Sequence, residues 1–121
     1  MYHRQTRILF VRADQLNRLI EQLPDPYSAS KELGEQATHM FKAIWNIEVK
    51  TEPGRKRFYR VMNRVAGWGV FTEPKPGRIV VESPAIVGEP FMRGYLESLL
   101  SVRLDTVEST VDRMVFEIKP K

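Results

Sequence analysis

The side chains best suited to chemistry in this sequence are large and apolar, and they recur at helical spacing. The set consists of Phe41, Trp45, Phe58, Met62, Trp68, Phe91 and Tyr95. Aromatic rings and methionines line pockets for apolar molecules, because they offer large contact areas with few polar atoms. Stripes of the same residue types also fill ordinary cores. The set therefore predicts either a solid interior or an apolar ligand site.

Trp68 is the strongest candidate in this set. It stands between Gly67 and Gly69, and glycines let the backbone and a ligand come close to a large ring. The hydroxyls of Tyr59 and Tyr95 would supply the polar contact to such a ligand.

A second candidate site is basic. It consists of Arg55, Lys56, Arg57, Arg60 and Arg64, with no acidic residue among them. Such a cluster is either the solvated face of a helix or a site for an anionic partner, which would be a nucleic acid, a lipid headgroup or an acidic protein. Tyr59, among the arginines, could stack on a base. No helix-turn-helix, zinc-finger or RNP-like signature accompanies the cluster, so any nucleic-acid binding should be weak and sensitive to salt.

Acidic residues offer little sign of catalysis. Glu32, Glu35 and His39 share one face of a helix, either as metal ligands or as a solvated face with an i,i+4 charge pair. Glu108 and Glu117 are the obvious acid pair of the last strands, where carboxylates are usually exposed. Nothing groups a nucleophile, a base and an oxyanion donor. We therefore expect no enzyme, no metal site and no cofactor.

Bulk composition predicts one domain over residues 1–121. The chain has no cysteine, which excludes disulfides and thiolate chemistry and favours a reducing, intracellular setting. A net charge of +4 allows an anionic partner without requiring one. We see no apolar run long enough for a signal peptide or a membrane span, so a cytoplasmic location is expected.

The spacing of apolar residues, together with the positions of proline and glycine, predicts the helices and strands that must position these residues. Helices are expected from Asp14 to Leu23, from Pro26 to Ile44, from Arg55 to Gly67 and from Pro90 to Leu100, and strands over 68–72, 78–82, 104–109 and 113–118. In the third helix Phe58, Val61, Met62 and Val65 should face inward, and Gly94 should let the last helix approach another backbone. The apolar run Ile8–Val11 is expected to form either an edge strand or an N-terminal arm that packs against the domain.

The order of helices, hairpin, helix and hairpin predicts the α+β class. We expect a mainly antiparallel sheet of about four strands packed against about four helices, which cover one face. Neither alternating βαβ winding nor a glycine-rich phosphate loop is present, so a dinucleotide fold is not expected.

From about Leu33 onward the chain resembles the 4-vinyl-reductase domain, which is related in fold to the ligand-binding domains of NO signalling and to TRAPP vesicle-tethering subunits. The likeness is carried by Leu33-Gly34-Glu35, Gly67-Trp68-Gly69, Phe91-Met92-Arg93-Gly94-Tyr95-Leu96-Glu97, Val107-Glu108-Ser109 and Val115-Phe116-Glu117-Ile118. It implies an intracellular module that binds a small, largely apolar molecule, often works with a regulatory partner and is sometimes dimeric. Many family members carry cysteines near the positions of Thr110 and Met114, which are thought to bind metal, and this chain has none.

These observations give three functional hypotheses. The first is a non-enzymatic domain that binds a small apolar molecule or senses it, and acts through a partner protein. The second is a TRAPP-like scaffold whose exposed apolar helix faces form a homodimer. The third is an anion-binding or nucleic-acid-binding protein that uses the basic helix from Arg55 to Arg64.

Overall fold

The structure is a computed structural model that describes residues 11–120. The run Ile8–Phe10 lies outside the described residues. The helices are α1 (Ala13–Glu21), α2 (Pro26–Trp45), α3 (Glu52–Val61), the π-helical turn η1 (Met62–Ala66) and α4 (Glu89–Leu100). The strands are β1 (Val70–Lys75), β2 (Arg78–Glu82), β3 (Leu104–Ser109) and β4 (Arg113–Ile118).

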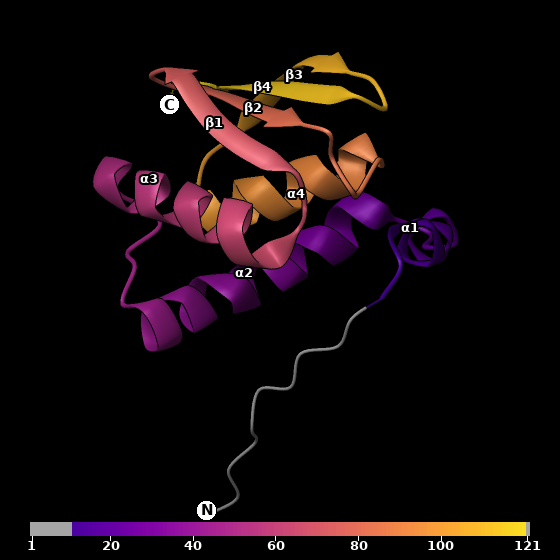
Figure 1. Ribbon diagram of the computed structural model, residues 1–121, viewed down its shortest axis with the longest axis horizontal. Helices are drawn as coiled ribbons and strands as arrows, with labels where there is room; N and C mark the ends of the chain where they lie inside the picture. The colour runs from indigo at the N-terminus through magenta and orange to yellow at the C-terminus, as the bar shows by residue number, and fades with distance from the viewer. Residues whose placement is uncertain (1–10, 121) are drawn as a thin grey trace, which may run out of the picture.

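The four strands form one antiparallel sheet in the order β1-β2-β4-β3. The two hairpins therefore meet through β2 and β4 in the middle, although α4 separates them in the chain. Figure 1 shows the helices on one side of this sheet. The predicted α+β class, with about four strands and about four helices, is confirmed.

Helix α4 lies between the sheet and α2 (Figure 1). Its buried residues go all round the helix and are Phe91, Met92, Gly94, Tyr95, Leu96, Glu97, Leu99 and Leu100. A helix that is buried on nearly every side belongs in the interior. The sequence analysis named only Phe91 and Tyr95 of this helix in its aromatic set, so the structure buries more of α4 than that set covers. Among the described residues, no helix has the length and apolar character needed to cross a membrane.

Two glycines allow α2 and α4 to touch along their backbones. A Cβ atom on Gly94 would lie 2.5 Å from the carbonyl oxygen of Tyr27, and one on Gly34 would lie 2.5 Å from that of Tyr95. Real Cβ atoms do not approach backbone oxygens so closely. The predicted close approach at Gly94 is confirmed, and its partner is the α2 backbone.

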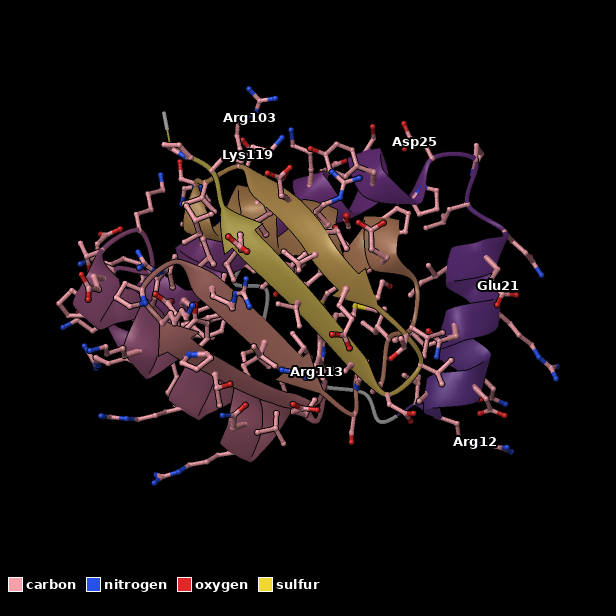
Figure 2. All side chains as sticks on the ribbon, turned by 90° about the horizontal axis from the view of Figure 1, so that it is seen from above. Arg12, Glu21, Asp25, Arg103, Arg113 and Lys119 are labelled. Carbon is pink, nitrogen blue, oxygen red and sulfur yellow. The ribbon has the colours of Figure 1, made fainter. Side chains whose placement is uncertain are left out.

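The open face of the sheet carries an apolar pair framed by charges. Val80 and Val115 are register partners and each is only 3% exposed, although neither points into the main core. Cross-strand ion pairs lie on either side of them, between Arg78 and Glu117 and between Arg113 and Glu82. Figure 2, which views the sheet from above, labels Arg113 on this face. The aliphatic stems of such long side chains shield apolar neighbours from water.

Several element boundaries differ from the sequence prediction. Helix α3 begins at Glu52 because the hydroxyl of Thr51 caps it through the N–H of Gly54. The prediction that Val65 faces inward is wrong, since its side chain is 60% exposed. Val65 is exposed because it lies in η1. The wider i→i+5 turn of η1 rotates the residues that follow around the helix axis.

We expect Gly94→Ala to lower the free energy of unfolding by about 1–3 kcal/mol, the range for overpacking a closed contact. The added methyl meets backbone, which cannot move aside cheaply. Chemical denaturation measures the change. Gly88→Ala is the control, because its Cβ would lie 3.7 Å from its nearest neighbour and should cost under about 1 kcal/mol. Equal effects at both positions would show that the α2–α4 contact is looser than described.

Candidate functional site

The predicted aromatic set divides into a solid part and an open part. Phe41, Phe58 and Met62 are at most 3% exposed and belong to the solid part. The ring of Phe58 lies edge-on to that of Phe41 at 5.1 Å and to that of Phe71 at 6.1 Å. These side chains pack against one another, so they form core and line no groove.

Trp45 lies apart from the rest of the set. It is the last residue of α2, and its side chain is 38% exposed. Asn46 ends the helix in the left-handed conformation, at φ 51°. The structure therefore places Trp45 on the surface. It does not line the groove that contains Trp68, which is described next.

The other three aromatic residues of the set come together at an apolar groove. It has a volume of about 490 Å³ and lies between α1, α2, the start of α4 and the loops around β1 and β2. Its lining consists of Leu16, Leu33, Gln36, Ala37, Met40, Trp68, Ile86, Phe91 and Tyr95. None of these side chains is charged. This groove is called the apolar groove below.

The glycines beside Trp68 position its ring in the apolar groove. Gly67 and Gly69 have φ values of 70° and 133°, which favour glycine. A Cβ atom on Gly69 would lie 2.9 Å from the carbonyl oxygen of Glu82, so this segment runs directly against the end of β2. The carbonyl of Trp68 also accepts a hydrogen bond from the N–H of Ala85 at 2.8 Å. The ring is then held 4.6 Å from that of Tyr95.

Tyr95 gives the apolar groove a polar group. Its side chain is 7% exposed, and within residues 11–120 its hydroxyl has no hydrogen-bond partner. Burial raises the pKa of Tyr95 to about 12, so the phenol stays protonated at neutral pH. A ligand in the groove would find one hydroxyl ready to donate a hydrogen bond.

Helix α1 closes one side of the apolar groove through Leu16. The amide of Asn17 fastens it to the loop before α4, because its nitrogen donates to the carbonyl of Ala85 and its oxygen accepts from the N–H of Val87. The sequence analysis did not identify Ile86, which lies in this loop and has no periodic neighbours. Leu33, Ala37 and Met40 of α2 also line the groove, and their i,i+4 and i,i+7 spacing is the signal that could have identified them.

The predicted basic cluster also divides. Arg55 donates two hydrogen bonds to the carboxylate of Glu73, at 3.1 and 3.2 Å, and the two side chains are 14% and 9% exposed. Tyr59 donates to the same carboxylate at 2.6 Å, as does the N–H of Gly77 at 2.9 Å. Arg55 therefore joins α3 to the β1–β2 hairpin. Its guanidinium is occupied by this contact.

The remaining members of the basic cluster, Lys56, Arg57, Arg60 and Arg64, are exposed. Arg57 donates to the carbonyls of Trp45 and Asn46, at 3.5 and 3.3 Å, and so covers the end of α2. Tyr59 is 5% exposed and faces Phe71 at a ring distance of 6.5 Å. It cannot stack on a base, because its ring is already packed inside.

Glu32, Glu35 and His39, the candidate metal ligands of α2, do not all border one groove. Glu35 and His39 line a second groove, whereas Glu32 does not. Within residues 11–120, no three His, Asp or Glu side chains are arranged to hold a metal ion. On the last strands, Glu117 is paired with Arg78 and Glu108 lies at the bulged edge of β3.

No protein-family model, curated protein or solved structure matches this chain. The likeness to the 4-vinyl-reductase domain therefore stays a prediction from the sequence.

The contact between Glu73 and Arg55 should be sensitive to acid. Burial opposes its ionisation, but the hydrogen bonds from Arg55, Gly77 and Tyr59 outweigh burial and lower its pKa below the usual 4.5. Because the folded pKa is the lower one, the contribution of Glu73 to stability is present above about pH 4.5 and is lost as pH falls through the folded value. We expect Glu73→Gln to lower the free energy of unfolding by about 2 kcal/mol at pH 7, somewhat less than for a fully buried pair.

Urea denaturation between about pH 3 and pH 7 checks this expectation, since Glu73→Gln should show a weaker dependence on pH than the parent. The control is Glu82→Gln, which breaks the half-exposed pair with Arg113 and should cost under about 1 kcal/mol. A Glu73→Gln protein with the parent's pH dependence would contradict the assignment.

Proposed function

We propose that this chain is a non-enzymatic domain that binds a small, uncharged, largely apolar molecule in the apolar groove and acts through a partner protein. The observation that carries the proposal is the lining of that groove, which combines three aromatic rings with aliphatic side chains and no charge. Ligand sites are typically apolar hollows of about 300–1,000 Å³ with a few placed polar groups. The absence of cysteine favours an intracellular site of action.

The polar groups of the apolar groove favour recognition over reaction. Tyr95 offers a hydroxyl and Gln36 an amide. A raised pKa makes Tyr95 a poor base at neutral pH, and no carboxylate or histidine lines the groove to activate it. A binding role needs only the hydrogen bond that this hydroxyl can donate.

The size and chemistry of the apolar groove can be tested with the neutral fluorophore N-phenyl-1-naphthylamine. Trp45→Phe leaves Trp68 as the only tryptophan, so energy transfer from Trp68 reports binding of the probe, and a change in the groove lining tests where it binds. We expect Leu33→Glu in this background to weaken probe binding at least tenfold, because it places a carboxylate in the apolar lining. Leu33 is 46% exposed, so the fold should tolerate the change.

Leu19→Glu is the matched control for this experiment. Leu19 is 63% exposed and lies on α1 outside the groove, so probe binding should stay within about twofold of the parent. The proposal fails if the probe does not bind the parent, or if both variants bind it as the parent does.

The second hypothesis, a dimerising scaffold, has one specific observation in its favour. Leu33, Met40 and Ile44 lie along α2 and are 46%, 37% and 54% exposed. Leu33 and Met40 border the apolar groove, and the stripe continues past it to Ile44. A run of exposed apolar side chains on one helix face is typical of protein interfaces.

If this face joins two copies, Ile44→Glu should weaken dimerisation at least tenfold, as analytical ultracentrifugation would show. It should leave probe binding in the apolar groove unchanged, because Ile44 does not line that groove. Val111→Glu is the control, since Val111 is 72% exposed in the β3–β4 turn. A parent protein that stays monomeric at high concentration would rule out the scaffold.

A further inference from the structure

A second groove lies on the other side of α2. It has a volume of about 590 Å³ and is bounded by α2, the end of α4, the turn into β3 and the last residues of β4. Its lining consists of Lys31, Glu35, Thr38, His39, Lys50, Glu97, Ser98, Ser101, Val102, Arg103, Ile118, Lys119 and Pro120. This groove is called the cationic groove below.

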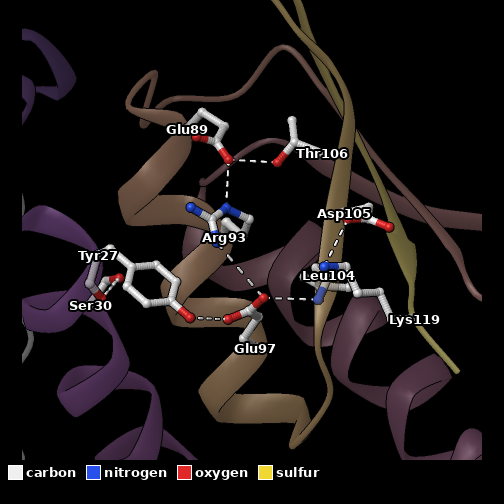
Figure 3. A network of polar contacts seen from close by, with 9 residues as sticks. All are labelled: Tyr27, Ser30, Glu89, Arg93, Glu97, Leu104, Asp105, Thr106 and Lys119. Atoms are coloured by element: carbon white, nitrogen blue, oxygen red, sulfur yellow. Dashed lines mark hydrogen bonds and ion pairs between the residues drawn. The ribbon is translucent and has the colours of Figure 1, made fainter. Parts of the chain in front are cut away.

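Two of the charged groups in the cationic groove already have partners. Lys119 pairs with Asp105 at 3.0 Å. Glu97 accepts hydrogen bonds from the hydroxyl of Tyr27 and, at 2.8 Å, from the N–H of Leu104. Figure 3 shows this carboxylate held between the tyrosine and the start of β3. Neither group is left to attract a ligand.

The remaining charges leave the cationic groove positive. Within residues 11–120, Lys31, Lys50 and Arg103 have no acidic side chain within ion-pair distance, and Glu35 has no basic one. Three unpaired cations exceed the one unpaired carboxylate by two charges, and Arg93 is shared between Glu89 and Glu97, so the net charge around the groove is about +1. Figure 2 shows Arg103 beside Lys119 at one end of the sheet, and the backbones of these two residues are joined by a hydrogen bond of 2.8 Å.

The partly negative end of α4 faces this charge, and two of its last four carbonyls are hydrogen-bonded. A helix C-terminus is partly negative because its last carbonyls are unpaired. Here the carbonyl of Glu97 accepts from the N–H of Val102 at 3.0 Å, and that of Leu99 lies 3.1 Å from the hydroxyl of Thr38, which it shares with the carbonyl of Gly34. Two serines beside them, Ser98 and Ser101, also line the groove.

From these observations we infer that the cationic groove binds a small organic phosphate. A phosphate monoester carries close to two negative charges at pH 7, which matches the unpaired cations. Its oxygens accept hydrogen bonds of the kind that lysine, arginine and serine donate. Val102, Ile118 and Pro120 give the organic part of the molecule an apolar surface. The exposed cations of α3 border neither groove, so they offer no comparable hollow.

The probe for this inference is phenyl phosphate, titrated into the full chain and followed by amide NMR shifts. We expect the largest shifts at Ser98, Ser101 and Thr38. Lys50→Glu combined with Arg103→Glu should weaken binding at least tenfold, because two attractive charges become repulsive. Phenyl sulfate, with one negative charge, should bind the parent several-fold more weakly than phenyl phosphate.

Lys56→Glu combined with Arg60→Glu is the matched control, with the same change of charge on the exposed face of α3. It should leave the affinity for phenyl phosphate within about twofold of the parent. If the charge reversal destabilises the fold, Lys50→Gln with Arg103→Gln is the second variant and should give a smaller loss. Equal losses on α3 and in the groove, or no binding to the parent, would overturn the inference.

A phosphate monoester can belong to a soluble molecule or to a lipid headgroup. Sedimentation with phosphatidylcholine vesicles, with and without phosphatidic acid, separates these sources. Binding that depends on phosphatidic acid and is lost in Lys50→Glu with Arg103→Glu supports the same site with a lipid as the source. Vesicle binding that survives in this variant would contradict it.

Discussion

The contact between α2 and α4 is the constraint on which the structure depends. The two helix backbones meet at Gly34 and Gly94, where side chains larger than hydrogen do not fit. This contact holds α4 under the sheet, and it divides the outside of the helix pair into two hollows. Leu33 and Met40 of α2 line the apolar groove, whereas Lys31 and Glu35 of the same helix line the cationic groove.

Burying α4 on all sides brings a carboxylate into the interior. Glu97 is 8% exposed, and an unpaired charge there would be costly. The hydroxyl of Tyr27 comes from α2 and the N–H of Leu104 from the start of β3, so the carboxylate is hydrogen-bonded to both neighbouring layers. Arg93 adds a charge 3.9 Å away and lies over the Tyr27 ring at 4.6 Å (Figure 3). The carboxylate of Glu97 would destabilise the fold if it were unpaired, but its hydrogen bonds connect α4 to α2 and to β3.

What the sequence could predict was local. Helix and strand positions followed from periodicity, proline and glycine, because those effects act within a few residues. The pair of Arg55 and Glu73 could not be predicted in this way, since 18 residues separate its members and the contact exists only once the hairpin packs on α3. The same limit applied to the aromatic set. The sequence placed Phe58 and Trp68 in one aromatic set, but only the tertiary packing separates a filled core from a groove.

The division of the two hollows bears on how their ligands relate. A single molecule with an apolar body and an anionic head would need a continuous path from Trp68 to Lys50, and no residue lines both grooves. The closed backbone contact at Gly34 and Gly94 lies along α2 and α4, the helices that supply side chains to both grooves. An uncharged ligand in one groove and an organic phosphate in the other would therefore occupy separate sites. Because the two grooves share no lining residue, ligand binding in each groove depends on its own side chains.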